Sequence, residues 1–142
     1  MKLVLDTDVI VAAMRSPQGA SAALLGRALQ GQVTLLANVP LMLEYEAVCL
    51  RPSHMVAAGL TVDQVGVFLD AVAALAKPVV THFLWRPQLR DAGDEMVLEA
   101  AVNGGAAAIV TFNLRDYGDA PLRFGIRVLL PRDALREIGG ER

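Results

Sequence analysis

Four acidic residues stand at points where a strand is expected to give way to a helix, namely Asp6, Glu44, Asp94 and Asp116. Asp6 follows the apolar run at residues 2–5, and Asp116 comes shortly after a similar run at residues 108–111. Because the ends of parallel strands in an open α/β sheet meet at one crevice, we expect these carboxylates to be neighbours. Gathered carboxylates repel one another unless a cation lies between them, and Mg²⁺ and Mn²⁺ prefer such oxygen ligands. The pattern therefore predicts a metal-dependent hydrolase of phosphate esters.

The elements that would position these residues alternate along the chain. Apolar runs predict strands at residues 2–5, 33–37, 78–80, 108–111 and 127–130, and helical periodicity predicts helices at 20–30, 39–50, 61–76 and 94–103, with a small helix after the last strand. Strands that are joined by helices of this length pair in parallel through right-handed crossovers. We therefore expect one domain over residues 1–142, an α/β three-layer sandwich with a parallel sheet of four to five strands.

Composition narrows the class of protein. The 142 residues are 54% hydrophobic and carry a formal net charge of −2. No apolar run approaches the roughly 18 residues of a membrane span. Asp6 and Asp8 break the apolar run that follows Met1, so the start of the sequence does not resemble a signal peptide. The single Cys49 cannot form an internal disulfide, so we expect a reducing, cytoplasmic setting. The net charge of −2 argues against a protein that binds nucleic acid by overall electrostatic attraction. This argument is weaker if the four acidic candidates bind a metal, because the rest of the chain then has a net charge of −2 + 4 = +2.

Each acidic candidate also has a purely structural explanation. Asp6 is explained equally by N-capping of a following helix, although Asp8 offers itself for that role as well. Glu44 and Glu46 both flank the apolar stripe of one helix, roughly 100° from its centre. Helical periodicity therefore does not choose between the two glutamates, and either is explained as a solvated flank.

The later candidates have the same ambiguity. Asp91 and Asp94 have the spacing of an acidic capping box, yet Asp94 shares a helix side with the apolar Val97, where a carboxylate needs a partner. Asn113 and Asp116 would each serve as a helix cap. A structural explanation is sufficient for any one of these residues. However, the presence of four acidic residues at strand ends or helix starts favours a shared metal-binding site.

The order and spacing of these motifs resemble a PIN-domain protein, of the kind identified as the toxin component of bacterial toxin–antitoxin pairs. The resemblance is carried by residues 4–9, 41–48 with Arg51-Pro52, 85–95 and 110–116. It covers nearly the whole chain, and the combination of motifs is specific although no single motif is.

The resemblance implies a PIN fold with strand order 3-2-1-4-5 and ribonuclease chemistry that depends on Mg²⁺ or Mn²⁺. Asp6, Glu44 and Asp94 match the acidic triad that holds the metal in the family. Glu44 is preferred to Glu46 because it stands six residues after Asn38, where the family usually has Ser.

Two residues depart from the family pattern: Asp8 stands where Asn is usual, and Asn113 stands where many relatives carry a fourth Asp. Asn113 still offers a carbonyl oxygen or a hydrogen bond to a water. Asp116, three residues later, restores the charge. We therefore expect Asn113 and Asp116 to take part in catalysis, Asp116 also as a metal ligand. The expected contacts to RNA phosphates are Arg86, Arg90 and Arg115.

Other functions remain open at this stage. Residues 6–9 also resemble the nucleophile motif of haloacid-dehalogenase-type phosphatases, although Glu44 would then have no role. A degenerate PIN domain that binds RNA or a partner protein without cutting is the second alternative, and the Asn113 departure favours it. The high apolar fraction and the resemblance together predict a homodimer that also binds a small antitoxin.

Overall fold

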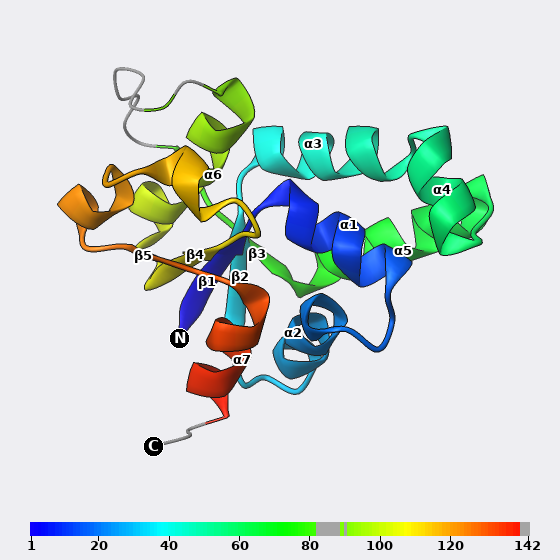
Figure 1. Cartoon of the computed structure of the whole chain (residues 1–142), viewed down its shortest axis with the longest axis horizontal. Coiled ribbons are helices and arrows are strands. Elements are labelled where there is room, and N and C mark those ends of the chain that lie inside the picture. Colours follow the sequence, from blue (N-terminus) through cyan, green and yellow to red (C-terminus); the bar gives the residue numbers. More distant parts are fainter. Residues whose placement is uncertain (82–88, 90, 140–142) are drawn as a thin grey trace.

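The computed structural model describes residues 1–81, 89 and 91–139. Within these ranges a five-stranded parallel sheet has the order β3-β2-β1-β4-β5 (Figure 1). Its strands are β1 (Lys2–Leu5), β2 (Thr34–Ala37), β3 (Ala76–Pro78), β4 (Ala108–Val110) and β5 (Arg127–Leu129). The α/β fold class and the strand order expected from the sequence are therefore confirmed.

β1 is the central strand and pairs with β2 on one side and β4 on the other. All but its first residue are at most 2% exposed, as expected for a parallel strand that is covered on both faces. Its last residue, Leu5, pairs with Val110 of β4. The next backbone N–H, from Asp6, continues the ladder by donating to the Val110 carbonyl at 2.9 Å. This register brings Asp6 and Thr111, which follow the two strands, to the same edge of the sheet.

Helices cover both faces of the sheet. They are α1 (Thr7–Arg15), α2 (Ala20–Leu29), α3 (Val39–Cys49), α4 (Pro52–Ala58), α5 (Val62–Leu75), α6 (Ala92–Gly104) and α7 (Pro131–Ile138), with two 3-10 helices, η1 (Leu114–Tyr117) and η2 (Pro121–Phe124). The β1-to-β2 and β3-to-β4 crossovers run in opposite directions, so right-handedness places α1 and α2 on one face and α6 on the other. α6 packs against β1, β2 and β4, and α2 packs against α1 and α7.

The observed elements differ from the expected ones in three main places. α1 (Thr7–Arg15) is not given bounds by the sequence analysis, which indicates only that Asp6 or Asp8 would cap a following helix. α4 is not expected from the sequence, because Pro52 is a natural stop after the preceding helix. Pro52 instead occupies the first turn of α4, where the missing N–H is not needed, and Gly59, at φ +69°, ends the helix. β3 occupies Ala76–Pro78 rather than residues 78–80, because the chain pairs with β2 directly after α5 ends.

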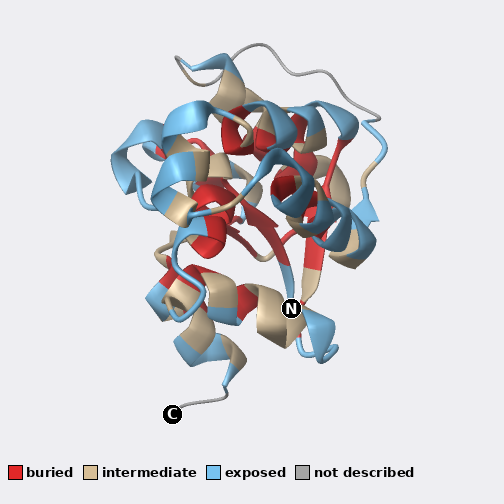
Figure 2. Cartoon of the chain, turned by 90° about the vertical axis from the view of Figure 1, so that its right-hand side faces the viewer, coloured by how far each residue is buried: buried red, intermediate tan, exposed pale blue. Residues whose placement is uncertain are grey.

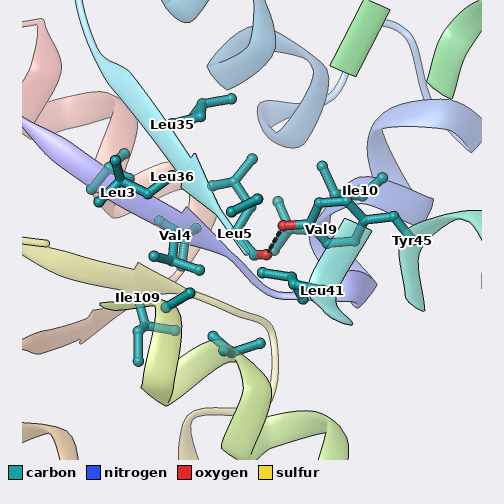
Figure 3. Packing of buried hydrophobic residues seen from close by; sticks show 14 of the residues in the cluster. Leu3, Val4, Leu5, Val9, Ile10, Leu35, Leu36, Leu41, Tyr45 and Ile109 are labelled. Atoms are coloured by element: carbon teal, nitrogen blue, oxygen red, sulfur yellow. Dashed lines mark hydrogen bonds between the residues drawn. The ribbon is translucent and has the colours of Figure 1, made fainter. Parts of the chain in front are cut away.

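A buried tyrosine fixes α3 against the end of β1. Buried residues line the sheet and the helix faces that cover it (Figure 2). Tyr45 of α3 is 2% exposed, and its hydroxyl donates a hydrogen bond to the Leu5 carbonyl (Figure 3). The bond gives a buried backbone acceptor its partner. Because Glu44 is the neighbour of Tyr45, the same contact sets where Glu44 stands relative to the end of β1.

Among the described helices, none is by itself long and apolar enough to cross a membrane. α4 and α5 reach the required length only when taken together, and their axes are bent by 89°.

Close packing at the end of α6 gives a stability prediction. A Cβ on Gly104 would lie 2.7 Å from Leu36 Cδ1 and 2.9 Å from Val79 Cγ2. We expect Gly104→Ala to lower the free energy of unfolding by about 1–3 kcal/mol, measured by urea denaturation, because the neighbours must shift. Gly66→Ala in α5 is the control: its Cβ meets nothing within 4 Å, so it should stabilise by about 0.5–1 kcal/mol. Equal effects of the two substitutions would contradict this packing.

Candidate active site

Asp6 has a defined hydrogen-bond partner on each carboxylate oxygen. It is the N-cap of α1, and its Oδ1 accepts the Thr7 backbone N–H at 2.7 Å. The capping explanation is therefore correct, but it accounts for only one oxygen. Oδ2 accepts the Thr111 hydroxyl at 2.8 Å and the Tyr117 hydroxyl at 3.0 Å. Asp6 is 8% exposed, and these bonds offset part of the unfavourable burial of a carboxylate.

Thr111 and Tyr117 hold Asp6, and the motif analysis does not name either of them as a site residue. Thr111 directly follows β4, the strand beside β1, and Tyr117 ends η1; both are completely buried. Burial, reinforced by the charge of Asp6, raises the pKa of Tyr117, so its hydroxyl keeps the proton that it donates. The available signal was the apolar run before Thr111, because neighbouring parallel strands end together.

Asp8 is the second residue of α1 and reaches the segment after β4. Its Oδ2 accepts the Asn113 side-chain N–H at 2.8 Å and the Phe112 backbone N–H at 3.1 Å. Its Oδ1 is buried and has no hydrogen-bond partner within the described part of the chain. Burial and, next, the charge of Asp6 raise the pKa of Asp8 to about 6. Asp8 is thus a partly buried carboxylate with an oxygen left for another ligand, and it was not among the expected site residues.

Asp94 comes to the same place from the first turn of α6. Asp91 is the N-cap, as the capping explanation expected, and its Oδ1 accepts the Gly93 N–H at 2.7 Å. Burial is the main cause that raises the pKa of Asp94 to about 7, followed by the charges of Asp6, Asp91 and Asp116, and a hydrogen bond with Tyr117 opposes the shift. The carboxylates of Asp6, which follows β1, of Asp94 on α6 and of Asp116 on η1 are therefore near enough to repel one another.

Glu44 faces this cluster from α3. Asn38 is the predicted N-cap of α3: its Oδ1 accepts the Leu41 N–H at 3.0 Å, and its Nδ2 donates to the Met96 carbonyl of α6 at 3.2 Å. This buried amide ties α3 to α6. A Cβ on Gly93 would lie 3.8 Å from Glu44 Oε2, and Glu44 lines a groove together with Asp8. Glu46 is exposed and does not line that groove.

The remaining expected residues divide into two groups. Asn113 contacts Asp8, as described above, and Asp116 is exposed on η1 near Asp94. Asp116 and Arg115 line a second groove of about 450 Å³ together with Asp94 and Tyr117. Arg86 and Arg90, expected to contact phosphate, lie outside the described residues.

The donor set suits a hard divalent cation, although the side chains do not enclose one as they stand. The gathered side chains offer only carboxylate and amide oxygens, which are the ligands that Mg²⁺ and Mn²⁺ prefer. In the described ranges, no three Asp, Glu, His or Cys side chains are placed to hold one ion. The unpartnered Oδ1 of Asp8 and the repulsion at Asp94 are both relieved by a cation, so the residues fit a metal by their chemistry.

Comparison with known proteins identifies the family. The family model described as PIN domain matches residues 2–115, and the chain therefore belongs to the PIN-domain family. Proteins with this domain are generally nucleases, and they typically use divalent metals. No curated protein and no solved structure matched the chain. The PIN resemblance expected from the sequence is thus confirmed.

The repulsion at Asp94 predicts a pH-dependent stability. In the folded protein Asp94 keeps its proton up to about pH 7, whereas its ordinary pKa is 3.8. The stability that this proton contributes is complete below about pH 4 and is lost as the pH rises through about 7. In metal-free buffer we expect Asp94→Asn to be more stable than the unmodified chain by about 1 kcal/mol at pH 8, since solvent screens a partly exposed carboxylate. At pH 4 the two should unfold alike.

Thermal unfolding at the two pH values measures this difference. Asp70→Asn, at an exposed position on α5, is the matched control and should have the same effect at both. A stability difference for Asp94→Asn that does not change with pH would contradict the proximity of these carboxylates.

Proposed function

We propose that the protein is a divalent-metal-dependent ribonuclease that cuts single-stranded RNA internally. The observation that carries the proposal is that carboxylates from the start of α1 (Asp6 and Asp8), from α3 (Glu44), from α6 (Asp94) and from η1 (Asp116) lie at one edge of the sheet. Burial and, next, the charges of Asp6, Asp91 and Asp116 raise the pKa of Asp94 to about 7. Repelling carboxylates at the carboxyl ends of parallel strands are an arrangement for binding a cation rather than for stability. Membership of the PIN-domain family supports the nuclease class.

Each of the chain's own residues has a role in this proposal. Asp6, Glu44 and Asp94, with Asp116, would hold Mg²⁺ or Mn²⁺. The bound cation would supply Lewis-acid activation of water and charge neutralisation at the phosphate. Thr111 and Tyr117 keep Asp6 in one orientation through hydrogen bonds of 2.8 and 3.0 Å. Asn113 donates a hydrogen bond to Asp8 and would orient a water in the proposed mechanism.

The two departures from the family pattern support an active site rather than a degenerate one. Family members usually have Asn where this chain has Asp8 and, in many cases, Asp where it has Asn113. The two side chains are hydrogen bonded to each other at 2.8 Å. The carboxylate and the amide have therefore exchanged places within one contacting pair, and the site keeps the negative charge that Asn113 alone would remove.

A phosphatase of the haloacid-dehalogenase type is disfavoured by the position of Glu44. Glu44, which would have no role in that chemistry, lines the same groove as Asp8.

The proposal extends to a biological role. The resemblance supports a toxin of a toxin–antitoxin pair that acts in the cytoplasm as a homodimer and is bound by a small antitoxin. Exposed apolar side chains such as Leu29, at 76% exposure, and Val56, at 81%, support a partner that covers apolar surface.

The adjacent glutamates of α3 give a matched test of the activity. With end-labelled single-stranded RNA and Mn²⁺, we expect Glu44→Gln to slow internal cleavage by at least about a hundredfold, because even indirect ligand contacts are worth that much. Glu46→Gln, exposed on the same helix, should cut at the rate of the unmodified protein. The products should end in 5′-phosphate and 3′-hydroxyl. Release of phosphate from a monoester with the RNA left intact would contradict the proposal, as would full activity of Glu44→Gln.

Metal binding is tested without RNA. Because a ligand of the folded state stabilises by mass action, Mn²⁺ at about 100 times its Kd should add about 2.7 kcal/mol and raise the Tm by several degrees. Asp6→Asn should abolish the rise, whereas Asp70→Asn should keep it. A catalytically degenerate domain that holds no metal would show no rise in the unmodified chain.

A further inference from the structure

A groove of about 610 Å³ extends away from the candidate active site, and its far end has the opposite charge. We call it the α1–α3 groove, because its walls are α1 on one side and α3 with the start of α4 on the other. Asp8, Glu44 and Phe112 line one end, and Arg15, Arg51 and His54 line the other.

Helical spacing accounts for this separation of charge. On α1 the lining residues Asp8, Val11 and Arg15 follow the spacing i, i+3, i+7, which places them on one face. On the other wall Glu44 and Val48 belong to α3, and Arg51 follows the end of that helix as the N-cap of α4. Each wall therefore starts with a carboxylate and ends with an arginine. On α1, the seven residues from Asp8 to Arg15 span about 10 Å along the helix.

The cationic end has donors that protein groups do not neutralise. Arg15 and Arg51 are exposed, and neither forms an ion pair with any residue that the structure describes. Arg15 Nη1 lies 3.4 Å from His54 Nδ1. Three cationic or donor side chains converge without a described acidic partner.

Helix capping explains only part of this arrangement. Arg15 is in the last turn of α1, where a cation interacts favourably with the helix dipole. Arg51 is the N-cap of α4, and its side chain makes no capping hydrogen bond.

The floor between the two ends is apolar. Val11 and Val48 are buried beneath it, and Phe112, 49% exposed, presents its ring at the acidic end. Single-stranded RNA alternates phosphates with flat base faces, which stack on aromatic rings and cover apolar surface. A span of about 10 Å corresponds to about three nucleotides at a rise of 3.4 Å, and to fewer when the strand is extended.

We propose that Arg15, Arg51 and His54 form a subsite for a backbone phosphate of the RNA strand whose scissile phosphate lies at the Asp6–Glu44 end. The inference rests on the proposed ribonuclease function and adds a direction for the strand, along the α1–α3 groove. An acidic polypeptide is the other anionic occupant, but it would meet Asp8 and Glu44 at the opposite end. A nucleic-acid strand avoids this repulsion at the acidic end, because the proposed metal ion would lie between its phosphate and the carboxylates.

The salt dependence of RNA binding tests the subsite. Fluorescence anisotropy of a labelled single-stranded oligonucleotide, in EDTA so that it is not cut, gives the slope of log K against log salt. Each phosphate contact with a single strand contributes about 0.7 to that slope. Arg15→Gln and Arg51→Gln should each lower its magnitude by about 0.7, and the double variant by about 1.4. Arg27→Gln, in the last turn of α2 and outside the groove, should leave it unchanged.

Kinetics in Mn²⁺ provide the second readout. The double variant should raise KM for RNA by at least about tenfold, since charge-assisted hydrogen bonds are lost, while kcat at saturating RNA stays within about twofold. The Mn²⁺-induced rise in Tm should be unchanged, because the acidic end is intact. Arg15→Lys with Arg51→Lys keeps both charges and should restore most of the salt slope, which separates loss of charge from loss of folding.

The outcomes distinguish the two levels of the proposal. If the unmodified protein neither binds nor cuts RNA, the proposed function fails and the subsite fails with it. If the unmodified protein cuts RNA while the double variant keeps its slope and KM, the function stands and the subsite is overturned. In that second case a polypeptide becomes the better occupant of the α1–α3 groove.

Discussion

Burying a carboxylate at the end of a central strand is unfavourable unless its oxygens are hydrogen bonded, and the contacts of Asp6 meet this constraint. Its partners come from three places: the first turn of α1, the end of β4 and the end of η1. The pairing of β1 with β4 makes the second contact possible, and the fold of η1 makes the third. The other carboxylates then gather around a residue that is already fixed, so the order of the site depends on Asp6 more than on any metal ligand beside it.

The exchange between Asp8 and Asn113 shows why single-position comparison with a family pattern is misleading here. The Asn113 departure alone suggests a weakened site. The side chains of Asp8 and Asn113 are 105 positions apart in sequence but only 2.8 Å apart in the structure. Electrostatics acts on position in space, so this contacting pair still carries one carboxylate.

The sequence predicts the sheet well because buried parallel strands read as short apolar runs, and residues such as Asp6 stand out at their ends. It does not choose between Glu44 and Glu46, since periodicity places both beside the apolar stripe. The structure orients them through Tyr45, whose bond to Leu5 is a contact between distant segments. Tyr117 is missed for the same reason, because its partner is 111 positions away. Arg15 and Arg51 line the same groove only because α1 packs against α3 and α4, and this packing cannot be read from the sequence.

Tyr117 lies outside the segment that the family model matches, although it contacts the candidate active site. The family match stops at residue 115, whereas the hydroxyl that holds Asp6 is supplied by residue 117, and the edge strand β5 and α7 come later still. α7 packs against α2, which packs against α1, the helix that Asp6 caps. A chain shortened to the matched region would keep the acidic triad but lose both a buried hydroxyl donor and the outer support of α1. The contacts that hold Asp6 and support α1 therefore extend beyond the segment that the family model matches.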